Sequence, residues 1–167
     1  MIDASIIALA EEVLRACRAE GLTLATAESC TGGLISGCLT EVAGSSDVVE
    51  RGFVTYSNAA KTAMLGVPAP LIAEHGAVSE PVARAMAEGA LAHSPADIAI
   101  AVTGVAGPGA SEAKPAGRVH LAVARRGRPV DHIRRDYGAI GRNGVRQATI
   151  RDALHLVLQA ASPSMTA

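Results

Sequence analysis

One stretch of the sequence passes from an apolar run directly into a polar turn: Leu22-Thr23-Leu24-Ala25-Thr26-Ala27-Glu28-Ser29-Cys30-Thr31-Gly32-Gly33. The run from Leu22 to Ala27 is short and apolar, which predicts a strand buried inside a sheet. A helix of small residues is predicted to follow, from Thr31 to about Val42. Because Ser29 lies between these two elements, we expect its side chain at the edge where the strand ends.

Two more polar segments follow predicted strands in the same way. The run 48–56 precedes a helix predicted at Asn58–Leu65, and the apolar run 97–103 precedes a stretch rich in Gly, Pro and Ala. Another helix is predicted at Glu80–Ala92, with Ser79 as its cap. Strands separated by helices are expected to be parallel, so their carboxyl ends meet at one edge, where open α/β sheets bind ligands. The sequence therefore predicts a small-molecule site at this edge.

The remaining segments complete an α/β fold. Apolar residues at helical spacing predict an amphipathic helix over residues 3–19 and a final helix over roughly 143–160. The runs 119–124 and 129–136 predict an antiparallel hairpin. We expect three layers, α/β/α, around a mixed and mostly parallel sheet of about five strands, in which the hairpin supplies the one antiparallel strand. The length of 167 residues suits a single domain spanning residues 1–167.

Composition narrows the classes of partner. The 15 basic and 16 acidic residues are spread along the chain, with a net charge of −1, so we expect no nucleic-acid partner. The sequence has neither a basic leader nor an apolar run that could span a membrane, which predicts a cytoplasmic protein without a membrane partner. Its three cysteines show no paired spacing, so neither a disulfide framework nor a metal site is expected, and no cofactor is predicted.

Ser29 and Lys61 are the candidates for nucleophilic chemistry. From the turn alone, Ser29 or Thr31 would simply cap the next helix, whereas a nucleophilic serine needs a base. No histidine lies beside the three polar segments, so the candidate base is Lys61, in the first turn of its helix, where the helix dipole and burial favour the free amine. The alternative is a solvated surface lysine. Tyr56 either packs as an ordinary strand residue, or its hydroxyl relays a proton or orients Lys61.

The other candidates are ambiguous when taken singly. Cys30 is a second choice of nucleophile, because a helix start lowers the pKa of a thiol, or else a buried small residue. Thr103 precedes glycines at 104, 107 and 109, which would let the backbone approach a ligand or serve only as turns. Arg142 and Arg146, at the start of the last helix, would hold a phosphate or lie on the surface.

Six motifs occur in order along the chain. They are Ala27-Glu28-Ser29-Cys30-Thr31-Gly32-Gly33, Gly44-Ser45-Ser46, Arg51-Gly52-Phe53-Val54-Thr55-Tyr56-Ser57-Asn58, Lys61, His75-Gly76-Ala77-Val78-Ser79-Glu80 and Thr103-Gly104-Val105-Ala106-Gly107-Pro108. Together they closely resemble the carboxy-terminal domain of the competence/damage-inducible protein A (CinA) family, from about Thr23 to Leu154. Members with this domain include stand-alone nicotinamide-nucleotide amidases of the PncC type.

The resemblance implies hydrolysis of the carboxamide of nicotinamide mononucleotide to nicotinic acid mononucleotide and ammonia, without a metal. It implies that Ser29 is the nucleophile and Lys61 its base, with Tyr56 beside them. Backbone N–H groups near Cys30 to Gly32 would hold the oxyanion, and protonated Lys61 would deliver a proton to the departing ammonia. The substrate-binding residues that we predict are Glu28, Cys30, Thr31, Gly32, Thr103, Gly104, Gly107 and Arg142.

The resemblance also implies a homo-oligomer, and we expect a complete stand-alone version of the domain because the first helix begins almost at Met1. Two segments depart from the family pattern. Gly141 precedes Arg142 where an acid is usual, and residues 109–115 have less glycine than related chains and no Glu directly before Lys114-Pro115. These departures leave open a catalytically decayed pyridine-nucleotide-binding module. An interaction protein in DNA uptake or damage responses is a third reading, which the family name alone suggests.

Overall fold

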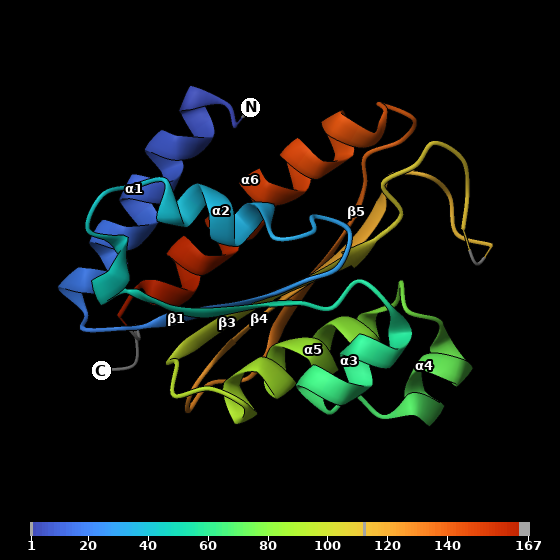
Figure 1. Cartoon of the computed structure of the whole chain (residues 1–167), viewed down its shortest axis with the longest axis horizontal. Helices are drawn as coiled ribbons and strands as arrows, with labels where there is room; N and C mark the ends of the chain where they lie inside the picture. The colour runs from blue at the N-terminus through green and yellow to red at the C-terminus, as the bar shows by residue number, and fades with distance from the viewer. Residues whose placement is uncertain (1, 112, 164–167) are drawn as a thin grey trace.

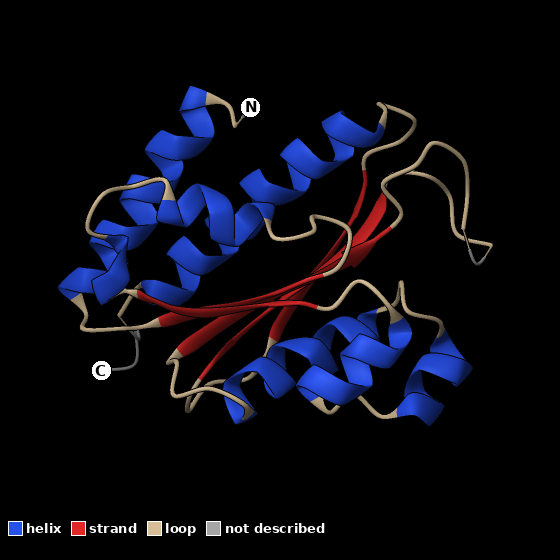
Figure 2. Ribbon diagram, in the orientation of Figure 1, coloured by secondary structure: helices blue, strands red, loops and turns tan. Residues whose placement is uncertain are grey.

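The computed structural model of the chain describes residues 2–111 and 113–163. These residues form one five-stranded sheet in the order β2-β1-β3-β4-β5 (Figure 2). Its strands are β1 (Leu24–Glu28), β2 (Val49–Val54), β3 (Ile98–Gly104), β4 (Arg118–Arg125) and β5 (Asp131–Asp136). Strand β1 is parallel to β2 and β3, whereas β4 is antiparallel to both of its neighbours. The predicted mixed sheet, with a carboxy-terminal hairpin and one antiparallel strand, is confirmed.

Helices cover both faces of the sheet (Figure 1). One face carries α1 (Ala4–Ala19), α2 (Leu34–Thr40) and α6 (Arg142–Ala161), and the other carries α3 (Asn58–Leu65), α4 (Ala69–His75) and α5 (Glu80–Ala92). The three-layer α/β/α fold class is therefore confirmed. Among the helices of the described residues, none combines the length and the apolar character that crossing a bilayer requires.

The two faces of the sheet bury different kinds of side chain. Alternation along β3 directs Ile98, Ile100 and Val102 toward α1 and α6, and Ala99 and Ala101 toward α5. The small alanine side chains on this face allow α5 to approach the sheet closely. Helix α5 also approaches α3 closely. A Cβ added to Gly89 of α5 would lie 2.0 Å from the carbonyl oxygen of Leu65 at the end of α3. This contact holds α3 firmly beside the sheet.

Most predicted boundaries agree with the structure, and those of α3 and α5 match to the residue. Helix α2 begins at Leu34 rather than Thr31, because Gly32 and Gly33 have φ of +57° and +101°, outside the helical region. Helix α4 was not predicted, since seven residues are too few to display a helical period. Ser79 precedes α5 as expected, but its hydroxyl donates to the Gly76 carbonyl and makes no capping bond, so the predicted cap is wrong.

Candidate active site

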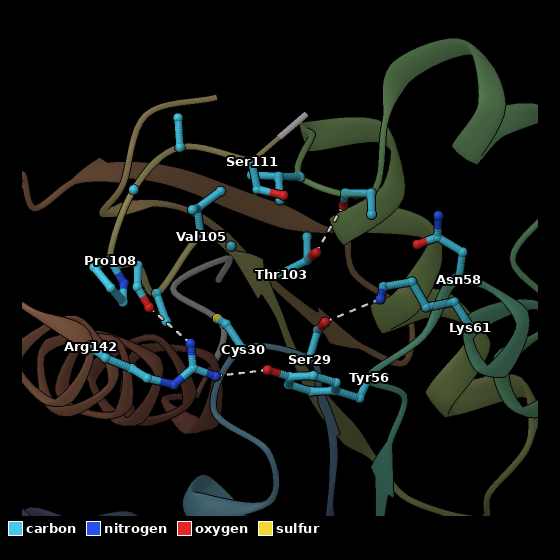
Figure 3. Close-up of a pocket in the computed structure, with 17 residues that line it drawn as sticks. Ser29, Cys30, Tyr56, Asn58, Lys61, Thr103, Val105, Pro108, Ser111 and Arg142 are labelled. Carbon is cyan, nitrogen blue, oxygen red and sulfur yellow. Dashed lines mark hydrogen bonds between the residues drawn. The ribbon is translucent and has the colours of Figure 1, made fainter. Parts of the chain in front are cut away.

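A cavity of about 340 Å³ lies at the carboxyl ends of the parallel strands (Figure 3). The turn after β1 contributes Ser29 and Cys30, and the segment after β2 contributes Tyr56, Asn58 and Lys61. The end of β3 and its following loop, residues 103–111, form another wall, and Ala77, Val78 and Arg142 complete the lining. The three polar segments from the sequence thus line one cavity, as parallel strands require.

Ser29 and Lys61 meet inside this cavity. Lys61 Nζ donates hydrogen bonds to Ser29 Oγ at 3.1 Å and to the Thr55 carbonyl oxygen at 3.0 Å. Lys61 is 1% exposed and Ser29 is 8% exposed. Burial favours an uncharged amine, which can donate one hydrogen to Thr55 and still turn its lone pair toward the serine hydroxyl. The pair has the geometry of a nucleophile and its general base.

Helix α3 is the element that brings Lys61 to Ser29. Ser57 caps α3, since its hydroxyl oxygen accepts a hydrogen bond from Ala60 N at 3.0 Å. The close contact at Gly89 presses the other end of α3 onto α5. Both ends of the helix are therefore held, and Lys61 extends from it into the interior rather than into solvent.

Glu28 is fully buried and does not line the cavity. Its carboxylate accepts hydrogen bonds from Thr31 Oγ1 at 2.6 Å, Ile35 N at 2.8 Å and Ser36 N at 3.1 Å. Glu28 thus occupies the amino-terminal end of α2, where free N–H groups and the helix dipole attract a negative charge. The side chains of Glu28 and Thr31 are thus engaged with each other and with α2, and neither residue lines the cavity where contact with substrate was predicted. This arrangement also corrects the expectation that Ser29 or Thr31 caps the helix.

Backbone N–H groups that could donate to a bound molecule come from the turn after Ser29 rather than from α2. In the first turn of α2, the Leu34 N–H donates to the Thr31 carbonyl, and the N–H groups of Ile35 and Ser36 donate to Glu28. In contrast, no backbone carbonyl of the described residues accepts a hydrogen bond from the N–H of Cys30 or of Thr31. Gly32 does not line the cavity, and its positive φ serves to shape the turn. Cys30 lines the cavity, whereas Thr31, like Gly32, does not. Of the predicted oxyanion donors, the Cys30 N–H is therefore the one that adjoins the cavity.

Tyr56 and Arg142 form a pair at the cavity wall. Arg142 donates to the Tyr56 hydroxyl at 2.7 Å and to the Gly107 carbonyl at 2.9 Å. Figure 3 shows the Tyr56 hydroxyl pointing toward Arg142 and away from Lys61. This orientation corrects the expectation that Tyr56 orients Lys61. Arg146 instead holds the turn after β1, because it donates to the Thr31 carbonyl at 3.1 Å.

Thr103 and the glycines shape the opposite wall. Thr103 Oγ1 donates to the Ala77 carbonyl at 2.8 Å, which ties the end of β3 to the loop before α5. Gly104 lines the cavity, but it is required by packing, since a Cβ there would lie 2.8 Å from the Arg118 carbonyl oxygen. Gly107 lines the cavity with φ +86° and presents its carbonyl to Arg142. The glycines therefore serve the loop and the strand contact.

Two other lining side chains change the candidate list. Burial raises the pKa of the Cys30 thiol to about 12, which disfavours the thiolate that a cysteine nucleophile needs. Asn58 was missed, although a signal was present: it precedes Lys61 by three residues on a predicted helix, a spacing that places both on one face. Within residues 2–111 and 113–163, no group of three or more His, Cys, Asp or Glu side chains could hold a metal ion.

The chain is similar to known proteins over nearly its whole length. The family model described as the CinA C-terminal domain matches residues 6–161. The nicotinamide-nucleotide amidohydrolase PncC of Escherichia coli strain K12 is 47% identical over 161 residues, which cover 95% of this chain and 96% of that protein. A CinA-like protein of Mycobacterium sp. strain JLS is 54% identical over 142 residues, and the match covers 84% of this chain but 33% of that protein.

The solved structures include a near match over the full length. The competence/damage inducible protein CihA from Agrobacterium tumefaciens is 50% identical and superposes with a TM-score of 0.93. The superposition covers 97% of this chain and 99% of that one. A CinA superfamily protein from Escherichia coli is 33% identical, with a TM-score of 0.89 and coverage of 96% and 94%. The chain therefore spans nearly all of these proteins, and about a third of the Mycobacterium relative.

Proposed function

The chain belongs to the CinA C-terminal domain family, and we propose that it hydrolyses the carboxamide of nicotinamide mononucleotide to nicotinic acid mononucleotide and ammonia. The name of the Escherichia coli relative supports this activity, because that protein aligns with nearly the whole chain. The proposal extends to one catalytic domain over residues 1–167, acting in the cytoplasm as a homo-oligomer on a small molecule rather than on nucleic acid.

The proposed mechanism begins with attack by Ser29. As the Ser29 Oγ to carbonyl carbon bond forms, the hydroxyl proton moves to Lys61 Nζ, and the carbonyl π electrons move to oxygen. The N–H group of Cys30, which lines the cavity, is the donor that we propose for this oxyanion. The Thr55 carbonyl accepts a hydrogen bond from Lys61 Nζ at 3.0 Å, which helps to hold the amine beside Ser29.

Collapse of the intermediate then breaks the carbon–nitrogen bond. Lys61 returns its proton to the departing nitrogen, ammonia leaves, and the acyl group remains on Ser29. Water attacks this acyl-enzyme with Lys61 again as base, and the product acid and free Ser29 result. The cycle consumes one water and needs no oxidant or reductant.

Arg142 is the residue that we propose for the substrate phosphate. Among the described lining residues the basic side chains are Lys61 and Arg142, and the Arg142 guanidinium lies across the cavity from the Lys61 amine (Figure 3). A planar guanidinium suits the bidentate geometry of a phosphate. Binding there would compete with the hydrogen bonds that Arg142 now makes to Gly107 and Tyr56.

The 3.1 Å contact between Lys61 Nζ and Ser29 Oγ is the observation that carries the proposal. The test is ammonia release from nicotinamide mononucleotide at neutral pH by the purified protein and by a Ser29→Ala variant. We expect release by the unsubstituted protein and none above background by the variant. Calorimetric binding of the nucleotide with no turnover would instead favour the decayed binding module.

A further inference from the structure

The polar side chains that line the cavity are not equally engaged. Lys61 contacts Ser29, Arg142 contacts Tyr56, and Thr103 contacts the Ala77 carbonyl. By contrast, no donor or acceptor among residues 2–111 and 113–163 is hydrogen-bonded to the side-chain amide of Asn58. Asn58 therefore presents a donor and an acceptor to whatever occupies the cavity.

The position of Asn58 is set by the same helix that carries Lys61. Asn58 begins α3 and precedes Lys61 by three residues, so both side chains extend from one face. Figure 3 shows the Asn58 amide and the Lys61 amine on the same side of the cavity, with Ser29 between that side and Arg142. A group bound against Ser29 therefore has Asn58 as a polar neighbour on the Lys61 side.

The chemistry of amide cleavage decides which part of the substrate faces that side. A leaving amine must receive a proton, and Lys61 holds the proton taken from Ser29. The leaving nitrogen consequently lies toward Lys61 Nζ, while the carbonyl oxygen turns toward the N–H group of Cys30. A primary carboxamide carries two N–H hydrogens, and one of them can reach an acceptor beside Lys61.

We propose that Asn58 is a specificity-determining residue, whose side-chain oxygen accepts a hydrogen bond from the leaving –NH₂ group and so selects primary carboxamides. This inference rests on the proposed function. The contact also directs the nitrogen lone pair toward the proton on Lys61 Nζ, and it is lost once ammonia leaves. The acid product, a carboxylate at neutral pH, offers no N–H to Asn58 and is held less well.

The test compares two substrates that share one acyl group. Nicotinamide mononucleotide and the methyl ester of nicotinic acid mononucleotide give the same acyl-enzyme, but the ester leaving group has no N–H. We expect Asn58→Ala to lower kcat/KM for the amide by about 10-fold and to change kcat/KM for the ester less than about 3-fold. Thr62→Ala is the matched control, because Thr62 is an exposed residue of α3 that does not line this cavity.

The amide-to-ester ratio separates the outcomes. The proposal is supported if the ratio of kcat/KM for the amide to kcat/KM for the ester falls in Asn58→Ala and is unchanged in Thr62→Ala. Both variants must keep the thermal unfolding midpoint of the unsubstituted protein. Equal loss on both substrates, or no loss on either, overturns the role of Asn58 while amide hydrolysis by the unsubstituted enzyme keeps the proposed function intact. Absence of amide hydrolysis by the unsubstituted enzyme overturns both.

Discussion

The contact between Lys61 Nζ and Ser29 Oγ joins side chains that lie 32 residues apart in the sequence. A lysine amine is seldom buried, because removing a charged ammonium from water is costly. Here the cost is offset by hydrogen bonds to a carbonyl and a hydroxyl, which a neutral amine can make without leaving a charge inside the protein. The residue is therefore suited to accept a proton only transiently, as a general base does.

Replacing Lys61 tests this role at the level of one side chain. We expect Lys61→Met to lower kcat for ammonia release by about 10²- to 10⁴-fold, since methionine fills the buried volume but cannot accept a proton. Lys61→Arg should be similarly inactive, because a guanidinium stays protonated. Initial rates, together with circular dichroism to verify folding, provide the measurement. A kcat within about 10-fold of the unsubstituted enzyme in Lys61→Met would exclude Lys61 as the base.

Glu28 illustrates a second residue whose role follows from its contacts. We expect Glu28→Gln to lower the free energy of unfolding by about 1–3 kcal/mol, because an amide nitrogen placed against Ile35 N or Ser36 N leaves a buried donor without an acceptor. Urea unfolding at pH 7 measures the change. Glu41→Gln, an exposed residue at the other end of α2, is the control, and equal stability of the two variants would contradict this assignment.

At the scale of elements, the site depends on how closely α3 and α5 approach. Small side chains on the α5 face of the sheet and Gly89 within α5 leave room for the end of α3. Lys61 lies in the middle of α3, so any outward shift of this helix moves the amine away from Ser29. The packing of α3 and the distance between Lys61 and Ser29 are therefore coupled through one glycine.

Two glycine substitutions in helices should have opposite effects. In Gly89→Ala the new Cβ would lie 2.0 Å from the Leu65 carbonyl oxygen, so we expect a loss of at least about 2 kcal/mol in the free energy of unfolding, with reduced activity. At Gly37 of α2, an added Cβ would meet nothing within 4 Å, and Gly37→Ala should gain about 0.5–1 kcal/mol. Chemical denaturation compares both. Tolerance of Gly89→Ala without loss would show that α3 moves freely.

At the scale of the whole molecule, a histidine pair joins the hairpin to α5. His120 Nδ1 of β4 and His132 Nε2 of β5 are 2.9 Å apart, and His132 Nδ1 lies 3.6 Å from Glu80 of α5. Burial, followed by the charge of His132, lowers the pKa of His120 to about 4. The cations that act on His120 in the same direction are Arg134, Lys114 and Arg118. Burial also lowers the pKa of His132.

This pair predicts a pH dependence of stability. The unfolded chain protonates His120 near pH ~6.5 and the folded chain near pH 4, so between these values the unfolded state binds more protons. The contribution of His120 to the free energy of unfolding is therefore complete above pH ~6.5. It is lost as the pH drops toward 4, by about 1–3 kcal/mol. Urea unfolding at pH 7.5 and pH 4.5 should show a smaller loss in His120→Gln, whereas His155→Gln, an exposed histidine, should retain the original loss. Equal losses in all three proteins would rule out His120 as the source.

Local pattern was sufficient to predict the strands, the helices α3 and α5 and the edge at which polar segments gather. These features depend on apolar spacing and on turn residues that are close in sequence, so neighbouring residues carry the information. The same reasoning placed Ser29 and Lys61 at one edge, because parallel strands share their carboxyl ends. Local pattern did not predict the short helix α4, because seven residues are too few to show a helical period. It also did not predict the late start of α2, because the positive φ of Gly32 and Gly33 leaves no periodic signal in the sequence.

Tertiary packing alone decided what each polar group contacts. Glu28 faces the end of α2 instead of the cavity, Tyr56 pairs with Arg142 instead of Lys61, and Asn58 joins the lining. The physical reason is that the neighbours of these side chains come from elements distant in sequence, and a buried group such as the Glu28 carboxylate must find its partners there, within about 3 Å. Such pairings are fixed when helices and sheet close on one another, and no local pattern contains them.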